Sequence, residues 1–195
     1  YLKITCAPYP TEENICKTCP AGKVTNQSSG TKTGAVDCYD CKAGYFPSTD
    51  GLSCVTCPVG KYCSNADCTS CQDCPAGKYA NKKGMTVCTN CKAGTYHSEA
   101  GAHKAGLCTE CEAGKYSANA GSESCSSCEE GTYSDEAGST TCKTCPAGKY
   151  ADASALTECT KCAGGKYSTK AGSSTCENCG SGYACPLGSS SRTIC

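Results

Sequence analysis

Apolar residues occur singly along this chain and never form the runs that build an ordinary core. Tyrosines and alanines are separated by Gly, Ser, Thr and Lys, with neither a helical period nor an apolar run of helical length. What recurs instead is Gly-Lys-Tyr-Ser or a variant of it, a turn, and a return toward the next cysteine. This pattern predicts short β-hairpins and loops, with little or no helix.

The cysteines repeat with a fixed period. Through most of the chain the unit is C-x2-C followed by thirteen residues and the next C-x2-C, with a three-residue insertion near 102–105. Such self-similarity indicates a repeat architecture. The predicted fold is small and disulfide-rich, an elongated tandem array of β-hairpin repeats of about 17 residues in which each unit touches only its neighbours.

Departures from the period divide the chain. We expect an N-terminal partial repeat in 1–18, two irregular repeats in 19–56, a repeat with an extra Cys pair in 57–73, regular 17-residue repeats in 74–178 and a variant repeat in 179–195. The chain opens at Tyr1 without a basic-then-apolar leader, which predicts a mature form or an excised piece. No apolar stretch approaches bilayer length, so we expect no membrane-spanning segment in this chain.

All ten units share a glycine three residues after the second cysteine. Because the same glycine recurs in all ten units, we expect that its backbone needs either positive φ or a close approach by another part of the chain. An aromatic residue, usually tyrosine, follows two residues later in most units. We interpret these rings as a ladder that packs against the disulfides, in preference to a platform for sugars or bases. The glycines are Gly22, Gly44, Gly60, Gly77, Gly94, Gly114, Gly131, Gly148, Gly165 and Gly182.

Cysteine replaces the missing core. The 195 residues include 25 Cys but no Trp, one Met and one Phe, so covalent staples must stabilise the fold. That cysteine content predicts an oxidising, extracellular location. The constant loop length suggests one pairing rule, in which the second Cys of each C-x2-C bonds the first Cys of the next. The rule predicts Cys19-Cys38, Cys41-Cys54, Cys57-Cys71, Cys74-Cys88, Cys91-Cys108, Cys111-Cys125, Cys128-Cys142, Cys145-Cys159 and Cys162-Cys176.

The ends and one irregular unit need separate assignments. Cys6-Cys16 begins the ladder, Cys63-Cys68 closes a small inner loop, and Cys179-Cys195 continues the rule. Cys185 is then left over from an odd total. We expect it to be unpaired or intermolecular, to bond beyond residue 195, or to rearrange the local pairing.

Other uses of C-x2-C remain open alternatives. Paired motifs about 13 residues apart also fit zinc ribbons, but such sites usually include histidine, and His97 and His103 both lie in or beside one insertion. A thioredoxin-like redox site lacks the βαβ pattern that would position it, and metallothionein-like storage would lack the aromatics. We therefore expect no metal and no cofactor.

Charge and polar motifs narrow the function further. Lys plus Arg and Asp plus Glu are both 18, so no global field favours nucleic acid. No catalytic constellation stands out, which predicts that the protein is not an enzyme. Asn26 is the acceptor of the only N-glycosylation sequon, and clusters of Ser and Thr indicate turns with some glycans.

Several motifs resemble a known extracellular module. C-P-A-G-K-Y at 74–79 and again at 145–150 resembles the ephrin-receptor-like cysteine-rich repeat and is similar to the first sub-module of TNF-receptor cysteine-rich domains. C-P-x-G-x-Y-C at 57–63 and the segment 182–191 resemble variants in protist and algal cell-surface proteins. The resemblance implies loop-closing disulfides, elongated stacking and extracellular display, but no particular ligand.

Two functions follow as hypotheses. The first is an extracellular structural rod, a glycoprotein of a surface coat, fibre or appendage that self-associates end to end. The alternative is the ligand-binding ectodomain of a receptor or surface antigen, in which the irregular units around 57–74 and the insertion at 97–104 carry recognition. Self-association distinguishes the two.

Overall fold

A chain of ten antiparallel two-stranded hairpins makes up nearly all the secondary structure of the described residues. The computed structural model describes residues 19, 21–25 and 38–195, so the expected Cys6-Cys16 bridge and the Asn26 sequon lie outside it. One short 3-10 helix, η1 (Ala105–Leu107), falls in the insertion. The structure confirms a disulfide-rich tandem of hairpins with little helix. The hairpins are β1 (Lys23–Thr25) with β2 (Cys38–Asp40), β3 (Tyr45–Pro47) with β4 (Cys54–Thr56), β5 (Lys61–Tyr62) with β6 (Gln72–Asp73), β7 (Lys78–Tyr79) with β8 (Thr89–Asn90), β9 (Thr95–Tyr96) with β10 (Thr109–Glu110), β11 (Lys115–Tyr116) with β12 (Ser126–Ser127), β13 (Thr132–Tyr133) with β14 (Lys143–Thr144), β15 (Lys149–Tyr150) with β16 (Thr160–Lys161), β17 (Lys166–Tyr167) with β18 (Glu177–Asn178), and β19 (Tyr183–Ala184) with β20 (Thr193–Ile194).

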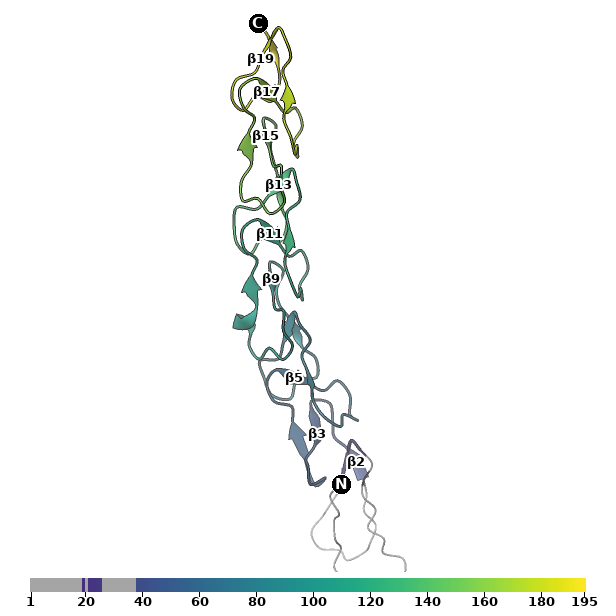
Figure 1. Ribbon diagram of the computed structural model, residues 1–195. Coiled ribbons are helices and arrows are strands. Elements are labelled where there is room, and N and C mark those ends of the chain that lie inside the picture. Colours follow the sequence, from purple (N-terminus) through teal and green to yellow (C-terminus); the bar gives the residue numbers. More distant parts are fainter. Residues whose placement is uncertain (1–18, 20, 26–37) are drawn as a thin grey trace, which may run out of the picture. The chain divides into compact units, whose positions relative to one another are not determined.

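Contacts between Cα atoms divide the chain into two compact units. Of the described residues, those up to residue 89 and residues 100–105 belong to unit 1, and residues 90–99 and 106–195 belong to unit 2. Within unit 2 the hairpins β11, β13, β15 and β17 follow one another in chain order (Figure 1). Each repeat is numbered here from the second cysteine of a C-x2-C. Repeats 1 to 10 therefore open at Cys19, Cys41, Cys57, Cys74, Cys91, Cys111, Cys128, Cys145, Cys162 and Cys179.

The return strand lies inside the C-x2-C motif, whereas the sequence pattern placed it before the cysteines. β12 (Ser126–Ser127), for example, is the pair of residues between Cys125 and Cys128. In this register the backbone N–H of Cys128 donates to the carbonyl oxygen of Gly114 at 2.9 Å. The next cysteine thereby closes the hairpin that the glycine opens.

Sulfur forms the buried core. The opening cysteines of repeats 2 to 10 are at most 3% exposed. Among the described tyrosines only Tyr167 is buried, at 9% exposed, and the other tyrosine rings are half-buried or exposed. The expected ladder of tyrosine rings therefore lies beside the row of buried cysteines and not within it.

In several repeats a second contact is made between the residue that follows the tyrosine and the residue five positions after that one. We call these two residues the inner pair of the repeat. In three repeats it is a serine pair, of which Ser117 and Ser122 are an example with their hydroxyl oxygens 2.7 Å apart. In repeat 3 the same pair is the disulfide Cys63–Cys68. Repeat 4 places the buried Ala80 here, in an apolar cluster against which Met85 packs. One location thus accepts a hydrogen bond, a disulfide or apolar packing.

Neighbouring repeats are joined by backbone hydrogen bonds that run in both directions. The N–H of Gly131 donates to the carbonyl of Ala151 in the next repeat at 2.9 Å. In the opposite direction, the N–H of Ala155 donates to the carbonyl of Cys128 at 2.8 Å. These bonds satisfy backbone groups that very short strands leave open.

Repeats two apart also touch, so the expectation that a unit contacts only its neighbours is wrong. A Cβ added at Gly60 in repeat 3 would lie 2.5 Å from the carbonyl oxygen of Gly101 in repeat 5. The same approach recurs from Gly114 to Ala155 and from Gly148 to Gly188. All ten of the glycines that lie three residues after an opening cysteine have positive φ, and at those named above the close approach is a second reason for glycine.

Ala155 takes the turn position that glycine holds in most repeats. It is the only non-glycine with positive φ among the described residues, at 61°. Its left-handed backbone carries a steric cost that glycine would not have.

We expect Ala155→Gly to stabilise the protein by about 0.5–1 kcal/mol, because relief of the left-handed strain exceeds the added entropy of the unfolded chain. Denaturant unfolding under non-reducing conditions measures the change. Ala153→Gly, at an exposed position without positive φ, is the matched control and should be neutral or destabilising. An Ala155→Gly variant no more stable than that control would contradict the argument.

Candidate functional site

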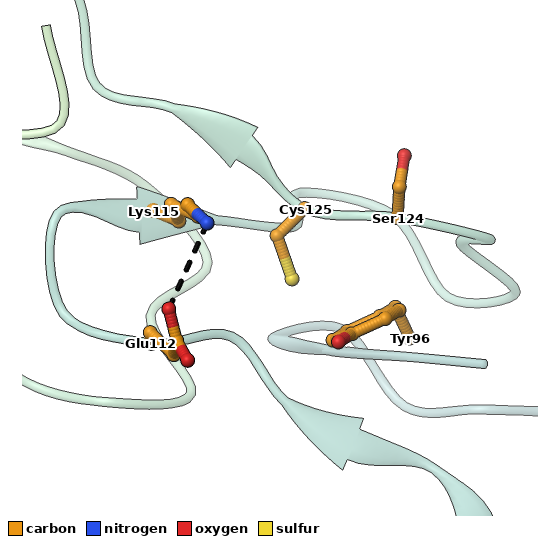
Figure 2. Close-up of a pocket in the computed structure, with 5 residues that line it drawn as sticks. All are labelled: Tyr96, Glu112, Lys115, Ser124 and Cys125. Atoms are coloured by element: carbon orange, nitrogen blue, oxygen red, sulfur yellow. Dashed lines mark ion pairs between the residues drawn. The ribbon is translucent and has the colours of Figure 1, made fainter. Parts of the chain in front are cut away.

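A groove with a tyrosine on one side recurs in unit 2. Groove A is lined by Tyr96, Glu112, Lys115, Ser124 and Cys125, with a volume of about 240 Å³. Figure 2 shows the Tyr96 ring opposite Ser124 and Cys125, with the ion pair of Glu112 and Lys115 at the other side. Their nitrogen and oxygen lie 3.7 Å apart and both side chains are well exposed.

The hairpins explain this arrangement. Tyr96 ends β9 in repeat 5, while Lys115 begins β11 directly after Gly114 in repeat 6. Cys125 is held in place by its disulfide to Cys111. The groove therefore lies between one repeat's aromatic residue and the next repeat's disulfide loop.

Groove B reproduces this layout two repeats later. It has a volume of about 390 Å³ and its lining residues are Tyr133, Asp135, Pro146, Lys149, Thr157, Glu158 and Cys159. Tyrosine, lysine and the first cysteine of a C-x2-C occupy the same repeat positions as in groove A. The layout thus occurs twice in unit 2, two repeats apart.

Hydrogen bonds shift the pKa values of three side chains in unit 2, one of which, Asp135, lines groove B. Asp135 accepts a hydrogen bond from Lys143 at 2.6 Å, which lowers the pKa of the carboxyl group and raises the pKa of the ammonium. In repeat 9 the Tyr167 hydroxyl donates to Glu177 at 3.0 Å. That hydrogen bond is the main reason that the pKa of Tyr167 is raised, with desolvation second.

The arrangement suits binding rather than bond-making. An aromatic edge beside a lysine and a carboxylate offers apolar contact and hydrogen bonds to a ligand. Sequence reasoning considered the tyrosines but missed the grooves, since each groove depends on how two successive repeats pack. The recurrence of lysine directly after the glycine was the available signal.

The disulfides occupy the cysteines at which sequence reasoning considered metal or redox chemistry. In the described residues the structure joins the nine pairs named by the spacing rule, and also Cys63 to Cys68. The same part of the chain contains no cluster of three His, Cys, Asp or Glu side chains arranged to hold a metal. His103 is exposed and His97 is half-buried.

The C-terminal repeat differs from the expected pairing. The structure joins Cys179 to Cys185 and leaves Cys195 as an exposed free thiol, where we expected Cys179-Cys195 and an unpaired Cys185. Cys179 and Cys185 lie in one buried cluster with Tyr167. The structure therefore shows the local rearrangement, in which Cys185 and not Cys195 bonds Cys179.

These features define a class: a cysteine-rich protein of tandem, disulfide-closed hairpin repeats. Residues 114–155 match the family described as tyrosine-protein kinase ephrin type A/B receptor-like. The matched segment begins at Gly114 and ends at Ala155, the two residues that meet across repeats 6 and 8. A search of curated proteins found no match to the chain. In the described residues, no helix is long and apolar enough to cross a bilayer.

Proposed function

We propose that this protein is an extracellular, non-enzymatic structural spacer, a repeat array that holds surface or matrix components at a set separation. The observation that carries the proposal is the continuity of the scaffold. Each described repeat from 2 to 10 buries its opening cysteine in a disulfide and hydrogen-bonds to its neighbour. Disulfides in such number persist in oxidising compartments.

In a spacer the distance between the two ends of a segment must increase with the number of repeats in that segment. This distance can be measured. Fluorescent labels attached to the flanks of repeats 6–9 should lie farther apart in proportion to the number of repeats inserted between them. The measurement is energy transfer on the oxidised protein, with a reduced and alkylated sample as the control. A label separation that does not change with repeat number would contradict the spacer proposal.

Thiol counting tests the oxidised scaffold separately. Alkylation of the native protein before mass spectrometry should leave the described cysteines other than Cys195 bridged. Zinc released in proportion to the C-x2-C motifs, together with many alkylated thiols, would contradict both the disulfide scaffold and the extracellular location.

The grooves favour a second candidate, a ligand-binding ectodomain of a receptor or surface antigen. Two grooves with the same chemistry, two repeats apart, offer a bivalent site to a repeating ligand. A glycan and peptide array probed with the wild-type chain and with Tyr96→Ala/Tyr133→Ala tests it. Binding lost only in that variant would support recognition by the grooves, and the absence of any specific binding would count against it.

A further inference from the structure

Repeat 4 differs from the other repeats in its charge. Residues 74–90 contain three lysines, Lys78, Lys82 and Lys83, and neither Asp nor Glu. Every other repeat from 1 to 9 contains at least one carboxylate. The chain as a whole has equal numbers of acidic and basic residues. Repeat 4 is therefore a local excess of positive charge within a neutral protein.

The lysines of repeat 4 make no ion pair in the described part of the chain. Lys82 and Lys83 are exposed in the loop of the hairpin, and Lys78 is half-buried in β7. The carboxylate that precedes this repeat, Asp73, is already paired with Lys61 at 2.8 Å. All five ion pairs of the described residues use lysines of other repeats, namely Lys23, Lys61, Lys92, Lys115 and Lys143. The three ammonium groups are thus free to meet an external anion.

Repeat 4 has the residue types of groove B at the same repeat positions, but without the carboxylates. Val87, which is 66% exposed, stands where groove B has Glu158, and Ser64 stands where it has Asp135. The Tyr62 ring of repeat 3 packs against the buried cluster of repeat 4, as a partly buried neighbour. A surface of mixed charge in repeat 8 is therefore purely cationic here. The residues of the same type as in groove B are Tyr62, Pro75, Lys78 and Cys88.

We call Lys78, Lys82, Lys83 and Val87 the lysine surface. Its composition favours a flexible polyanion over a folded protein. Interfaces between folded proteins depend on buried aromatic and aliphatic anchors, and lysine is depleted at their cores. Here one valine offers apolar area, whereas three flexible ammonium groups can each contact a separate anionic group while they stay hydrated. A polyanion gains affinity at such a surface by releasing its counterions.

We propose that the lysine surface binds a sulfated polysaccharide of the matrix or cell surface. Sulfate groups on successive sugars supply the fixed, repeated negative charges that match several ammonium groups within one hairpin. Val87 and the Tyr62 ring contact the apolar faces of the sugars between them. Binding at repeat 4 attaches the array to a matrix and leaves the grooves of unit 2 free. The inference rests on the extracellular location proposed above.

The test is binding of the 195-residue chain to immobilised dextran sulfate at several salt concentrations, with uncharged dextran as the reference. We expect the wild type to bind dextran sulfate and not dextran. Lys78→Gln/Lys82→Gln should weaken binding about tenfold at low salt, because two solvated ion contacts are lost. It should also reduce the slope of log affinity against log salt by about two, roughly one for each ammonium removed.

Lys166→Gln/Lys170→Gln in repeat 9 is the matched control. It removes lysines from the same two repeat positions and changes the net charge by the same amount, but repeat 9 also contains Glu177. This control should bind as tightly as the wild type. Lys78→Arg/Lys82→Arg keeps the charge and should also bind like the wild type. Denaturant unfolding under non-reducing conditions should give all these variants the wild-type stability, which excludes misfolding as the cause of a loss.

Three outcomes would overturn the proposal. One is a wild-type chain that does not bind dextran sulfate. Another is an equal loss of binding in the repeat 4 and repeat 9 variants, which would indicate attraction by net charge alone. The third is self-association at low salt in place of polysaccharide binding, which would assign the lysine surface to the four carboxylates of repeat 7 in a second copy. None of these changes the expected dependence of label separation on repeat number, so failure of this inference and failure of the spacer proposal are distinguishable.

Discussion

Gly148→Ala is expected to destabilise repeats 8 to 10 far more than Gly165→Ala does, although the two glycines have nearly the same backbone. Their φ values are 82° and 83°. Alanine at either position carries the left-handed penalty of about 1 kcal/mol. Only at Gly148 does the new methyl group also meet the backbone of a repeat two places on, at Gly188.

That backbone is not free to yield. The N–H of Gly188 donates to the carbonyl of Cys162 at 2.8 Å, and repeat 10 is further held by the Cys179–Cys185 disulfide. Overpacking against such a backbone typically costs a further 1–3 kcal/mol, so we expect a total near 3 kcal/mol for Gly148→Ala.

Amide hydrogen exchange resolves the effect by position. The amides of Gly188 and Gly148 should lose protection in Gly148→Ala and keep most of it in Gly165→Ala, with denaturant unfolding providing the free energies. Equal losses in the two variants would show that φ alone makes glycine necessary and that repeats two apart do not stabilise one another.

Removal of disulfides should depend strongly on which bridge is removed. Cys128→Ser/Cys142→Ser opens a loop whose closure contributes about 3 kcal/mol, and it leaves a hydroxyl in the place of a fully buried sulfur. We expect it to destabilise the protein by about 3–5 kcal/mol.

Cys63→Ser/Cys68→Ser is the matched comparison, because other repeats already have serine at both of these positions. Ser134 and Ser139 form the same inner pair with hydroxyl oxygens 2.7 Å apart. The loop is short and a hydrogen bond replaces the bridge, so the expected cost is only about 1–2 kcal/mol. Chemical denaturation of both double variants under non-reducing conditions measures the difference. A Cys63→Ser/Cys68→Ser variant as unstable as the other would contradict the equivalence of the inner pairs.

The local features of the fold were predictable from sequence because each is decided within one repeat. The glycine three residues after each opening cysteine, such as Gly94, has the positive φ that its recurrence indicated. Hairpin formation follows from the same short pattern. The position of the return strand was not evident, since alternation over two residues carries almost no periodic signal.

Features that depend on several repeats were not predictable in the same way. The contact from Gly60 to Gly101 depends on how three successive repeats pack, which a linear pattern does not encode. The departure of the C-terminal repeat from the pairing rule was visible in the sequence. Arg-Thr-Ile-Cys at 192–195 has the length of a C-x2-C with its first cysteine replaced, which assigns Cys195 to the next link of the ladder.

Contact between repeats two apart gives the array a parity. Odd-numbered repeats support odd ones and even-numbered repeats support even ones, as in the approaches of Gly131 to Gly172 and of Gly114 to Ala155. Both grooves run from an odd repeat to the following even one. Stability in such an array therefore extends beyond nearest neighbours, and a lesion in one repeat should also weaken repeats that it does not adjoin in the sequence.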